Sequence, residues 1–351
     1  MSYTNGLDNP SLYFNTKLYT GNGSTQSING IGFQPDATWI KARSGTYGTE
    51  NHNFYNAISG ATKFLIPNGT SSEGTDANSI TSFDSDGFSA GTRTDINGSS
   101  TEYVAWNWLA SNTTASNTDG SITSTVSANT TSGFSIVSYT GNGSTNQSVG
   151  HGLSQTPEIL ITKGRTNVQN WAVYGSVIGT DNRLYLNTTD AVATISGYLP
   201  ADTSSVINLS GTSSMSNINT SSIDYITYAF HSVKGYSKIG SYTGNGSSDG
   251  TFVYTGFKPA FLILKRYDST NNWYMYNNKV NPYNETDRPL KADTSESEST
   301  IFGGNELDFL SNGFKLRDTL GATNASGASY IYMCFAENPF VTSTSIPCTA
   351  R

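Results

Sequence analysis

The sequence predicts an all-β protein made of three tandem homologous antiparallel β-sandwich units with a jelly-roll-like form. The first observation is composition: only 35% of residues are hydrophobic and 13% charged, and 35 are glycine. Ser, Thr and Asn compete for backbone hydrogen bonds, and Gly loses the most entropy in a helix, so this mixture favours strands and turns. The second observation is one phrase that occurs three times, and the third is a fixed order of landmarks behind it. The 21 Tyr, 16 Phe and 5 Trp residues suffice for several thin two-layer cores.

The repeated phrase is YTGNGS, which begins at Tyr19, Tyr139 and Tyr242. An Asn-Gly pair tolerates positive φ at both central positions of a type I′ turn. We therefore interpret the phrase as a hairpin turn at the start of each unit. A phosphate-binding glycine loop would need a helix directly after it, and no helical pattern follows.

Four landmarks follow the phrase in the same order in each copy. They are a proline, a short strand that ends in lysine, an aromatic patch that ends in tyrosine, and a closing strand. In the first closing strand Val104, Trp106 and Trp108 recur with period two, which predicts a strand with one buried face. The landmarks of the three copies are Pro35, Pro157 and Pro259; Lys41, Lys163 and Lys265; Tyr55, Tyr174 and Tyr276; and Trp108, Phe230 and Phe335.

These landmarks set the predicted organisation of the chain. We expect an N-terminal arm over 1–16, unit 1 over 17–110, a Ser/Thr/Asn-rich linker over 111–133, unit 2 over 134–232, unit 3 over 233–340, and a tail over 341–351. The linker is nearly free of charge and of large apolar groups, so it is expected to be a polar spacer with at most one weak strand. Units 2 and 3 are joined by few residues and are expected to pack closely, with unit 1 better separated.

Motifs that could carry chemistry all have a simpler interpretation. The spacing of His52, His151 and His231 matches no zinc site, and His52 stands where the other copies have Trp, which indicates packing. DSDGF (84–88) resembles part of a calcium loop, but the third copy has LSNGF there, so a turn explains both. Around Ser89, GFSAG lacks the helix that a nucleophile elbow requires. No metal and no cofactor is predicted.

Other polar residues leave alternatives open. Lys41, Lys163 and Lys265 either form a repeated basic spot for acidic glycans or, as we favour, are strand-end charges that pair with local carboxylates. Glycoside cleavage needs two facing carboxylates; the candidates, which the sequence does not pair, are Asp84, Asp86 and Asp224.

Charge and hydropathy limit the partners. The net charge is −7 and no Lys/Arg run follows a phosphate backbone, so nucleic acid is not expected. No stretch is apolar enough for membrane insertion, and the N-terminus has no secretory signal pattern. Of the two cysteines, Cys334 is expected to be a buried small hydrophobe, and Cys348 lies in the tail. The protein is expected to be made in a reducing cytoplasm.

Longer stretches resemble a known group of proteins. DNPSLYFNTKLYTGNGSTQSINGIGFQPDATWIKARSG, ITSFDSDGF, YVAWNW and SNTDGSITSTVSANTTSGFSIVSYTGNGSTNQSVGHGLSQTPEILITKGR are similar to repeat proteins encoded by marine tailed phages, such as cyanophages. The resemblance covers all three units and is greatest from Asp8 to Arg165; the third unit departs from it at GTFVYTGFKPAF. It implies a virion structural, tail-fibre-like protein that is assembled in the host cytoplasm.

The expected function is therefore that of a non-enzymatic protein on the exterior of a tailed-phage virion. It would be a tail-fibre or tail-tip host-attachment component or a head fibre or capsid decoration, with other virion proteins as partners, a host surface glycan as a possible receptor, and a homotrimer as a possible assembly. The alternative is a carbohydrate-binding module or glycan-degrading protein. In that case exposed aromatic residues of the patch would stack on sugars: Trp171, Trp273 and Tyr274.

Overall fold

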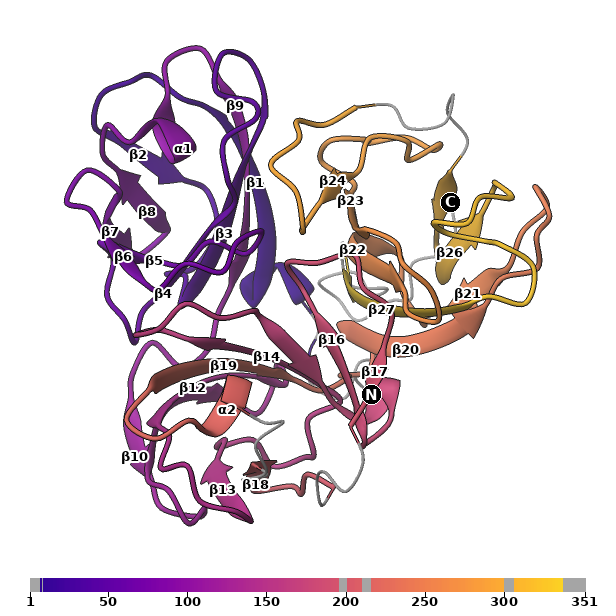
Figure 1. The fold of residues 1–351 in the computed structure, drawn as a ribbon. Helices are drawn as coiled ribbons and strands as arrows, with labels where there is room; N and C mark the ends of the chain where they lie inside the picture. Colours follow the sequence, from indigo (N-terminus) through magenta and orange to yellow (C-terminus); the bar gives the residue numbers. More distant parts are fainter. Residues whose placement is uncertain (1–6, 8, 196–200, 210–215, 300–305, 337–351) are drawn as a thin grey trace.

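The computed structural model describes residues 7, 9–195, 201–209, 216–299 and 306–336. Antiparallel strands make up nearly all of the regular structure, which confirms the all-β prediction (Figure 1). The helices among these residues are single turns: η1 (Pro10–Leu12), α1 (Thr94–Asn97), η2 (Ser176–Ile178) and α2 (Ser216–Asn219). None of the described helices has the length and apolarity needed to cross a bilayer.

The described strands fall into three lobes that are consecutive in the chain and surround a common centre (Figure 1). Lobe 1 has a sheet with the order β1-β9-β3-β4, a facing sheet β2-β8-β7 and a small pair β5-β6. Its strands are β1 (Phe14–Thr20), β2 (Gln26–Asn29), β3 (Ala37–Ser44), β4 (Asn53–Asn56), β5 (Lys63–Phe64), β6 (Gly74–Thr75), β7 (Ile80–Asp84), β8 (Gly87–Ala90) and β9 (Glu102–Trp108).

Lobe 2 has a large sheet of the order β10-β11-β12-β19-β14-β15-β16-β17 and a facing pair β13-β18. Its strands are β10 (Ala115–Asn117), β11 (Ser124–Asn129), β12 (Phe134–Thr140), β13 (Gln147–Gly150), β14 (Ile159–Gly164), β15 (Ala172–Tyr174), β16 (Asn182–Tyr185), β17 (Ala193–Thr194), β18 (Val206–Leu209) and β19 (Asp224–Phe230).

Lobe 3 has a sheet of the order β20-β27-β22-β23-β24 and a facing sheet β21-β26-β25. Its strands are β20 (Ser237–Thr243), β21 (Phe252–Tyr254), β22 (Pro259–Arg266), β23 (Trp273–Asn277), β24 (Leu290–Lys291), β25 (Leu307–Leu310), β26 (Gly313–Leu316) and β27 (Ser329–Ala336).

One strand order recurs in the three lobes. In each lobe the strand that leads into the YTGNGS phrase (β1, β12 or β20) pairs with the closing strand. The closing strand also pairs with the strand that contains the repeated lysine, and that strand pairs with the aromatic strand. The repeated letters therefore occupy equivalent positions in three equivalent pairing schemes. Between its two layers each lobe has a core of its own, which includes Tyr55 in lobe 1, Tyr174 in lobe 2 and Tyr276 in lobe 3.

Two of the predicted boundaries differ in the structure. Stretch 111–133 is not a spacer, because β10 and β11 extend the large sheet of lobe 2, with Val126 opposite Val137. Backbone ladder bonds need no apolar side chains, so a polar sequence can form edge strands. The arm also ends earlier than expected: β1 starts at Phe14, whose ring stacks on that of Phe335 with 4.8 Å between centroids. The predicted tail, 341–351, lies outside the described residues.

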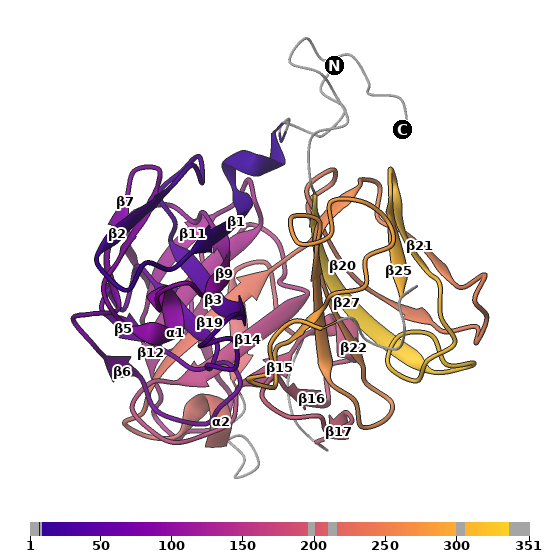
Figure 2. The ribbon, with the colours of Figure 1, turned by 90° about the horizontal axis from the view of Figure 1, so that it is seen from above.

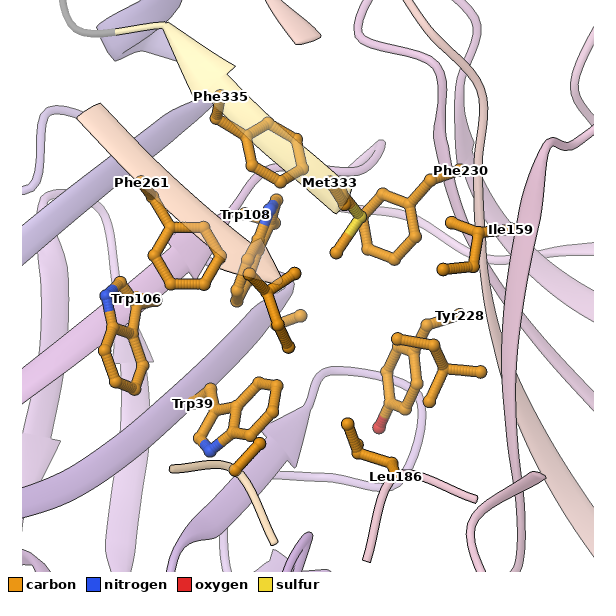
Figure 3. Packing of buried hydrophobic residues seen from close by; sticks show 14 of the residues in the cluster. Trp39, Trp106, Trp108, Ile159, Leu186, Tyr228, Phe230, Phe261, Met333 and Phe335 are labelled. Atoms are coloured by element: carbon orange, nitrogen blue, oxygen red, sulfur yellow. The ribbon is translucent and has the colours of Figure 1, made fainter. Parts of the chain in front are cut away.

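The largest core lies between the lobes and not inside any one of them (Figure 3). Trp106 and Trp108 of β9, Tyr228 and Phe230 of β19, and Met333 and Phe335 of β27 all belong to it. The opposite faces of these strands fill the cores of their own lobes, so the closing strands are buried on both faces. The prediction of half-buried strands is wrong for this reason.

The expectation that the first unit stands apart is also wrong. Lobe 1 packs against both other lobes: the Phe54 and Tyr228 ring centroids are 4.4 Å apart, and those of Trp106 and Phe261 are 5.4 Å apart. Figures 1 and 2 show the three lobes close together around the centre. The large apolar face of β9 excludes water only when the other two lobes cover it. A void of about 20 Å³ remains at the centre, with apolar walls that include Trp39, Trp171 and Met333.

Candidate functional site

The YTGNGS phrase does not form a hairpin. In lobe 1 the strand before it, β1, belongs to one sheet and the strand after it, β2, belongs to the facing sheet. The phrase is thus the crossing between the two layers of the lobe. The second glycine has the positive φ that the Asn-Gly pair predicts, +70° at Gly23 and Gly143 and +65° at Gly246.

A buried asparagine from the far end of each lobe holds this crossing. In lobe 1 the Asn97 side chain accepts a hydrogen bond from the Asn22 amide (3.0 Å) and donates one to the Ser24 carbonyl (2.6 Å). The Asn22 side chain in turn accepts from the Ser24 amide (2.7 Å). The Gly23 amide donates to the Asn97 carbonyl (2.9 Å). These bonds hold the crossing to the Asn97 turn of the same lobe.

The same clamp occurs in the other two lobes. Asn219 accepts from the Asn142 amide (3.0 Å), and Asn324 accepts from the Asn245 amide (3.0 Å). The tyrosine of the phrase stacks on a tyrosine of the closing strand, at centroid distances of 5.2, 5.3 and 4.9 Å; the pairs are Tyr19 with Tyr103, Tyr139 with Tyr225, and Tyr242 with Tyr330. The phrase is thus a structural element of each lobe.

Sequence reasoning missed these asparagines, because Asn is too common in this chain for three of them to stand out. A usable signal was available. Each lies six residues before the closing-strand tyrosine: Asn97 before Tyr103, Asn219 before Tyr225, and Asn324 before Tyr330.

The aromatic patch joins neighbouring lobes through one repeated hydrogen bond. The Trp171 indole N–H donates to the Ile66 carbonyl of lobe 1 (2.8 Å), and the Trp273 indole N–H donates to the Tyr185 carbonyl of lobe 2 (2.9 Å). His52 occupies the equivalent place in lobe 1, with Nε2 3.0 Å from the Lys291 carbonyl of lobe 3. The three contacts run in one direction around the centre and close a ring of three junctions.

His52 has a defined tautomer in this ring. A carbonyl oxygen only accepts, so Nε2 carries the hydrogen, and Nδ1 accepts from the Trp39 indole at 2.8 Å. Burial lowers the pKa of His52 well below its ordinary value. The interpretation of His52 as a packing residue agrees with this position. His151 and His231 also bond to backbone atoms of their own lobe.

Ion pairs strengthen two of the three junctions. Arg165 of lobe 2 makes a bidentate pair with Glu73 of lobe 1, with N–O distances of 2.8 and 2.9 Å. Arg43 of lobe 1 makes the same pair with Glu298 of lobe 3, at 2.7 and 2.9 Å. At the third junction the equivalent residues, Val192 and Tyr267, carry no charge; both pack against the central core, and the backbone bond between them is kept (2.8 Å).

The three repeated lysines are fully buried, so they form no basic patch on the surface. Their ammonium groups donate to backbone carbonyls and not to the carboxylates that we expected. Lys163 Nζ donates to Thr70 of lobe 1 (3.2 Å) and to Gly164 (2.8 Å), and Lys265 Nζ donates to Thr189 of lobe 2 (2.9 Å) and to Asn271. Lys41 Nζ donates to Ala42 and Gly48, both at 2.7 Å. Burial lowers the pKa of each lysine to about 8.

The residues suggested for sugar stacking are all inside the protein. Trp171 is 1% exposed, Trp273 3% and Tyr274 4%. The first two face the central core, and Tyr274 belongs to the core of lobe 3. Their ring faces are covered by protein, so a sugar has no access to them in this fold. The repetition of the patch reflects its place at the lobe junctions.

The suggested acidic and nucleophilic residues have local partners. Asp86 accepts from the Gly30 and Gly32 amides (3.0 and 2.6 Å), and Asp84 accepts from the Ser89 hydroxyl (2.8 Å). Asp224 accepts from Thr140 (2.7 Å). Asp84 lies opposite Gly87 in the β7–β8 hairpin, as the turn interpretation requires. Among the described residues no three His, Cys, Asp or Glu side chains gather in a way that suits a metal ion.

Comparison with known proteins gives one match. Residues 9–339 match the profile of a family described as a domain of unknown function, DUF7483. The chain belongs to this family. The DUF7483 region includes every strand of the three lobes, so one family unit comprises the whole ring of junctions and not a single lobe. No curated protein and no solved structure shows significant similarity to the chain.

Proposed function

We propose that this DUF7483 chain is a non-enzymatic structural protein on the exterior of a tailed-phage virion, made of three duplicated β-sandwich units. The observation that carries the proposal is that the repeated residues have structural roles. The clamp asparagines join the two layers of a lobe. The junction Trp and His residues join neighbouring lobes, and so do two of the three buried lysines, Lys163 and Lys265. The sequence resemblance to marine phage repeat proteins supplies the virion context.

The nested strand pairing supports the duplication. In each lobe the strand before the YTGNGS phrase pairs with the closing strand, and the strand after the phrase pairs with a late strand in the facing sheet. Such nested pairing is also a property of jelly rolls. A chain whose three units close on one shared core is suited to life outside the cell, because backbone ladders and burial hold its described part together without a disulfide. Cys334, as predicted, is a buried free thiol.

The location on the particle is tested by imaging. Phage particles that encode this chain would be purified, analysed by mass spectrometry, and imaged by cryo-electron microscopy. We expect the chain in the particles, with its three-lobed density on the tail fibre or tail tip, or on the head as a fibre or decoration. The number of copies in the same map gives the oligomeric state. It therefore tests the homotrimer, which we propose by analogy with phage fibres. Absence of the chain from purified infectious particles would refute the proposal.

A second candidate, glycan binding, is favoured by one surface feature of lobe 3. Phe252 and Tyr254 on the edge strand β21 are 44% and 66% exposed. Register places Phe252 at the position of Ser27 and Tyr254 at that of Asn29 in lobe 1. The change from polar to aromatic is thus confined to two outward positions, whereas Val253 between them stays buried. Exposed aromatic rings on a rigid strand give sugars an apolar face to stack on.

Matched substitutions test this candidate. Phe252→Ser with Tyr254→Asn installs the residues of lobe 1, and Tyr283→Ser removes another aromatic that is 84% exposed. If β21 binds glycans, retention on host envelope polysaccharide is lost in the double variant and kept in the Tyr283 variant. Equal retention of the wild type and the double variant would exclude β21.

A further inference from the structure

Strand β21 of lobe 3 forms an open edge of its sheet. Within the described part of the chain it pairs only with β26, and Figures 1 and 2 show it on the outer side of lobe 3, away from the other two lobes. Its central residue, Val253, is buried, whereas the residues on either side of it are exposed, Phe252 by 44% and Tyr254 by 66%. An open edge offers its outward backbone groups to another strand.

The backbone groups of β21 alternate in direction. The Leu316 amide of β26 donates to the Thr251 carbonyl at 3.0 Å. Hydrogen-bonded pairs recur at every second residue of an antiparallel ladder, so Val253, two residues further on, also faces β26. The N–H and C=O groups of Phe252 and Tyr254 therefore point away from β26, toward the open edge.

The equivalent edge in lobe 2 shows that this position accepts a further segment. Ser148 of β13 occupies the place of Phe252, because each precedes the buried valine of its edge strand. The Ser148 carbonyl accepts from the Ile122 amide (2.9 Å), and the Ser148 amide donates to the Ser121 hydroxyl (2.9 Å). In lobe 2 a segment of the same chain thus pairs with the outward groups, whereas in lobe 3 no described strand does so.

The side chains at the β21 edge favour contact with another chain. In lobe 1 the same two positions are Ser27 and Asn29, whose polar groups water solvates well. The aromatic rings of lobe 3 expose apolar surface that water solvates poorly. Lys315, opposite Phe252 on β26, forms an ion pair with Asp249, so the charge beside the edge is already neutralised.

We propose that β21 pairs with β21 of a second copy of the chain, antiparallel and across a two-fold axis at Val253. In this arrangement Phe252 lies opposite Tyr254 of the partner subunit, and their outward N–H and C=O groups bond to each other. An edge whose outward groups are symmetric about its central residue is complementary to itself, which is why a second copy fits it. The rings form cross-strand aromatic pairs, and the two three-stranded sheets become one.

The contact goes beyond the proposed structural role, because it pairs copies whether they belong to one assembly or to two. It involves two short strands and four rings, which is small compared with the roughly 1,200–2,000 Å² that standard interfaces bury. We therefore expect a weak association that depends on the protein concentration.

Sedimentation equilibrium of the full chain between about 5 and 500 µM tests the contact. The mean mass of the wild type should rise toward twice its value at the lowest concentration. Phe252→Ser with Tyr254→Asn should weaken the association about tenfold or more. Tyr254→Pro should weaken it more than Tyr254→Asn, because proline also removes an outward N–H and no bond to β26. Tyr283→Ser, which removes an 84% exposed ring outside β21, is the control and should associate as the wild type does.

Amide hydrogen exchange of the wild type, followed by NMR, gives a readout that does not depend on variants. The Phe252 and Tyr254 amides should exchange more slowly as the protein concentration rises, whereas the Ser27 and Asn29 amides of lobe 1 should keep one rate. No glycan is present in either experiment, so the result is independent of the glycan candidate at β21. A mass that is constant with concentration, constant exchange at the two β21 amides, or equal association of wild type and double variant would overturn the proposal.

Discussion

Replacing Lys163 with methionine tests the buried lysines through the pH dependence of stability. Lys163 is fully buried in the folded protein, where its pKa is about 8, against 10.5 for an exposed lysine. Between these two values the unfolded chain holds a proton that the folded protein has released. Stability linked to this group therefore rises with pH above 8 and is constant well below it. The full shift corresponds to about 3 kcal/mol, at roughly 1.4 kcal/mol for each pH unit.

The measurement is the free energy of unfolding in urea at pH 7.0 and pH 9.5, for the wild type and for Lys163→Met. Between these pH values the wild type should gain about 2 kcal/mol relative to the variant, because methionine has a similar length and does not titrate. Both proteins have the same tyrosines, which destabilise the fold at high pH when they ionise in the unfolded chain. This contribution cancels when the free energies of unfolding of the two proteins are subtracted.

Two further variants complete the test. Lys265→Met, the equivalent change in lobe 3, should reproduce the effect, since that pKa is also about 8. For Lys234→Met, at an exposed position, the difference in the free energy of unfolding from the wild type should be the same at pH 7.0 and pH 9.5. A constant difference between wild type and Lys163→Met from pH 7.0 to 9.5 would refute the argument, because Lys163 would then titrate alike in the folded and unfolded chains.

Three other predictions concern Glu306, the Asn219 clamp and the Arg165–Glu73 ion pair. Burial raises the pKa of Glu306 to about 8, so the stability of the wild type falls as the pH rises from 4.5 to 8. In urea unfolding, Glu306→Gln should gain about 3 kcal/mol of stability relative to the wild type between pH 5 and 7.5. A difference that does not change with pH would contradict this. Asn219→Ala removes the clamp of the second crossing and leaves the Ser144 carbonyl without its donor, so it should cost about 2–3 kcal/mol in the same assay; a cost under 0.5 kcal/mol would disprove the clamp. A double-mutant cycle of Arg165→Met and Glu73→Gln should give a coupling of about 1–3 kcal/mol, whereas zero coupling would mean that the pair does not join the lobes.

The sequence alone determined the local structure and its repetition. Alternation in YVAWNW, DYITYAF and SYIYMCF, together with the Asn-Gly turns, indicated strands in a repeated order, and the strands occur at these places. Such patterns depend on contacts within a strand or a turn, which neighbouring letters specify. The position of His52 among the tryptophans followed from the same comparison of copies.

Only the tertiary structure decided what the faces of the strands meet. The pattern predicts one buried face at Trp106 and Trp108. The residues that cover this face include Phe261 of β22 and Phe335 of β27, more than 150 residues away in the chain. The same holds for Lys163, whose ammonium is held by a carbonyl from lobe 1. A period-two pattern predicts that a side chain is buried. The identity of its neighbours depends on how the three lobes close around one core.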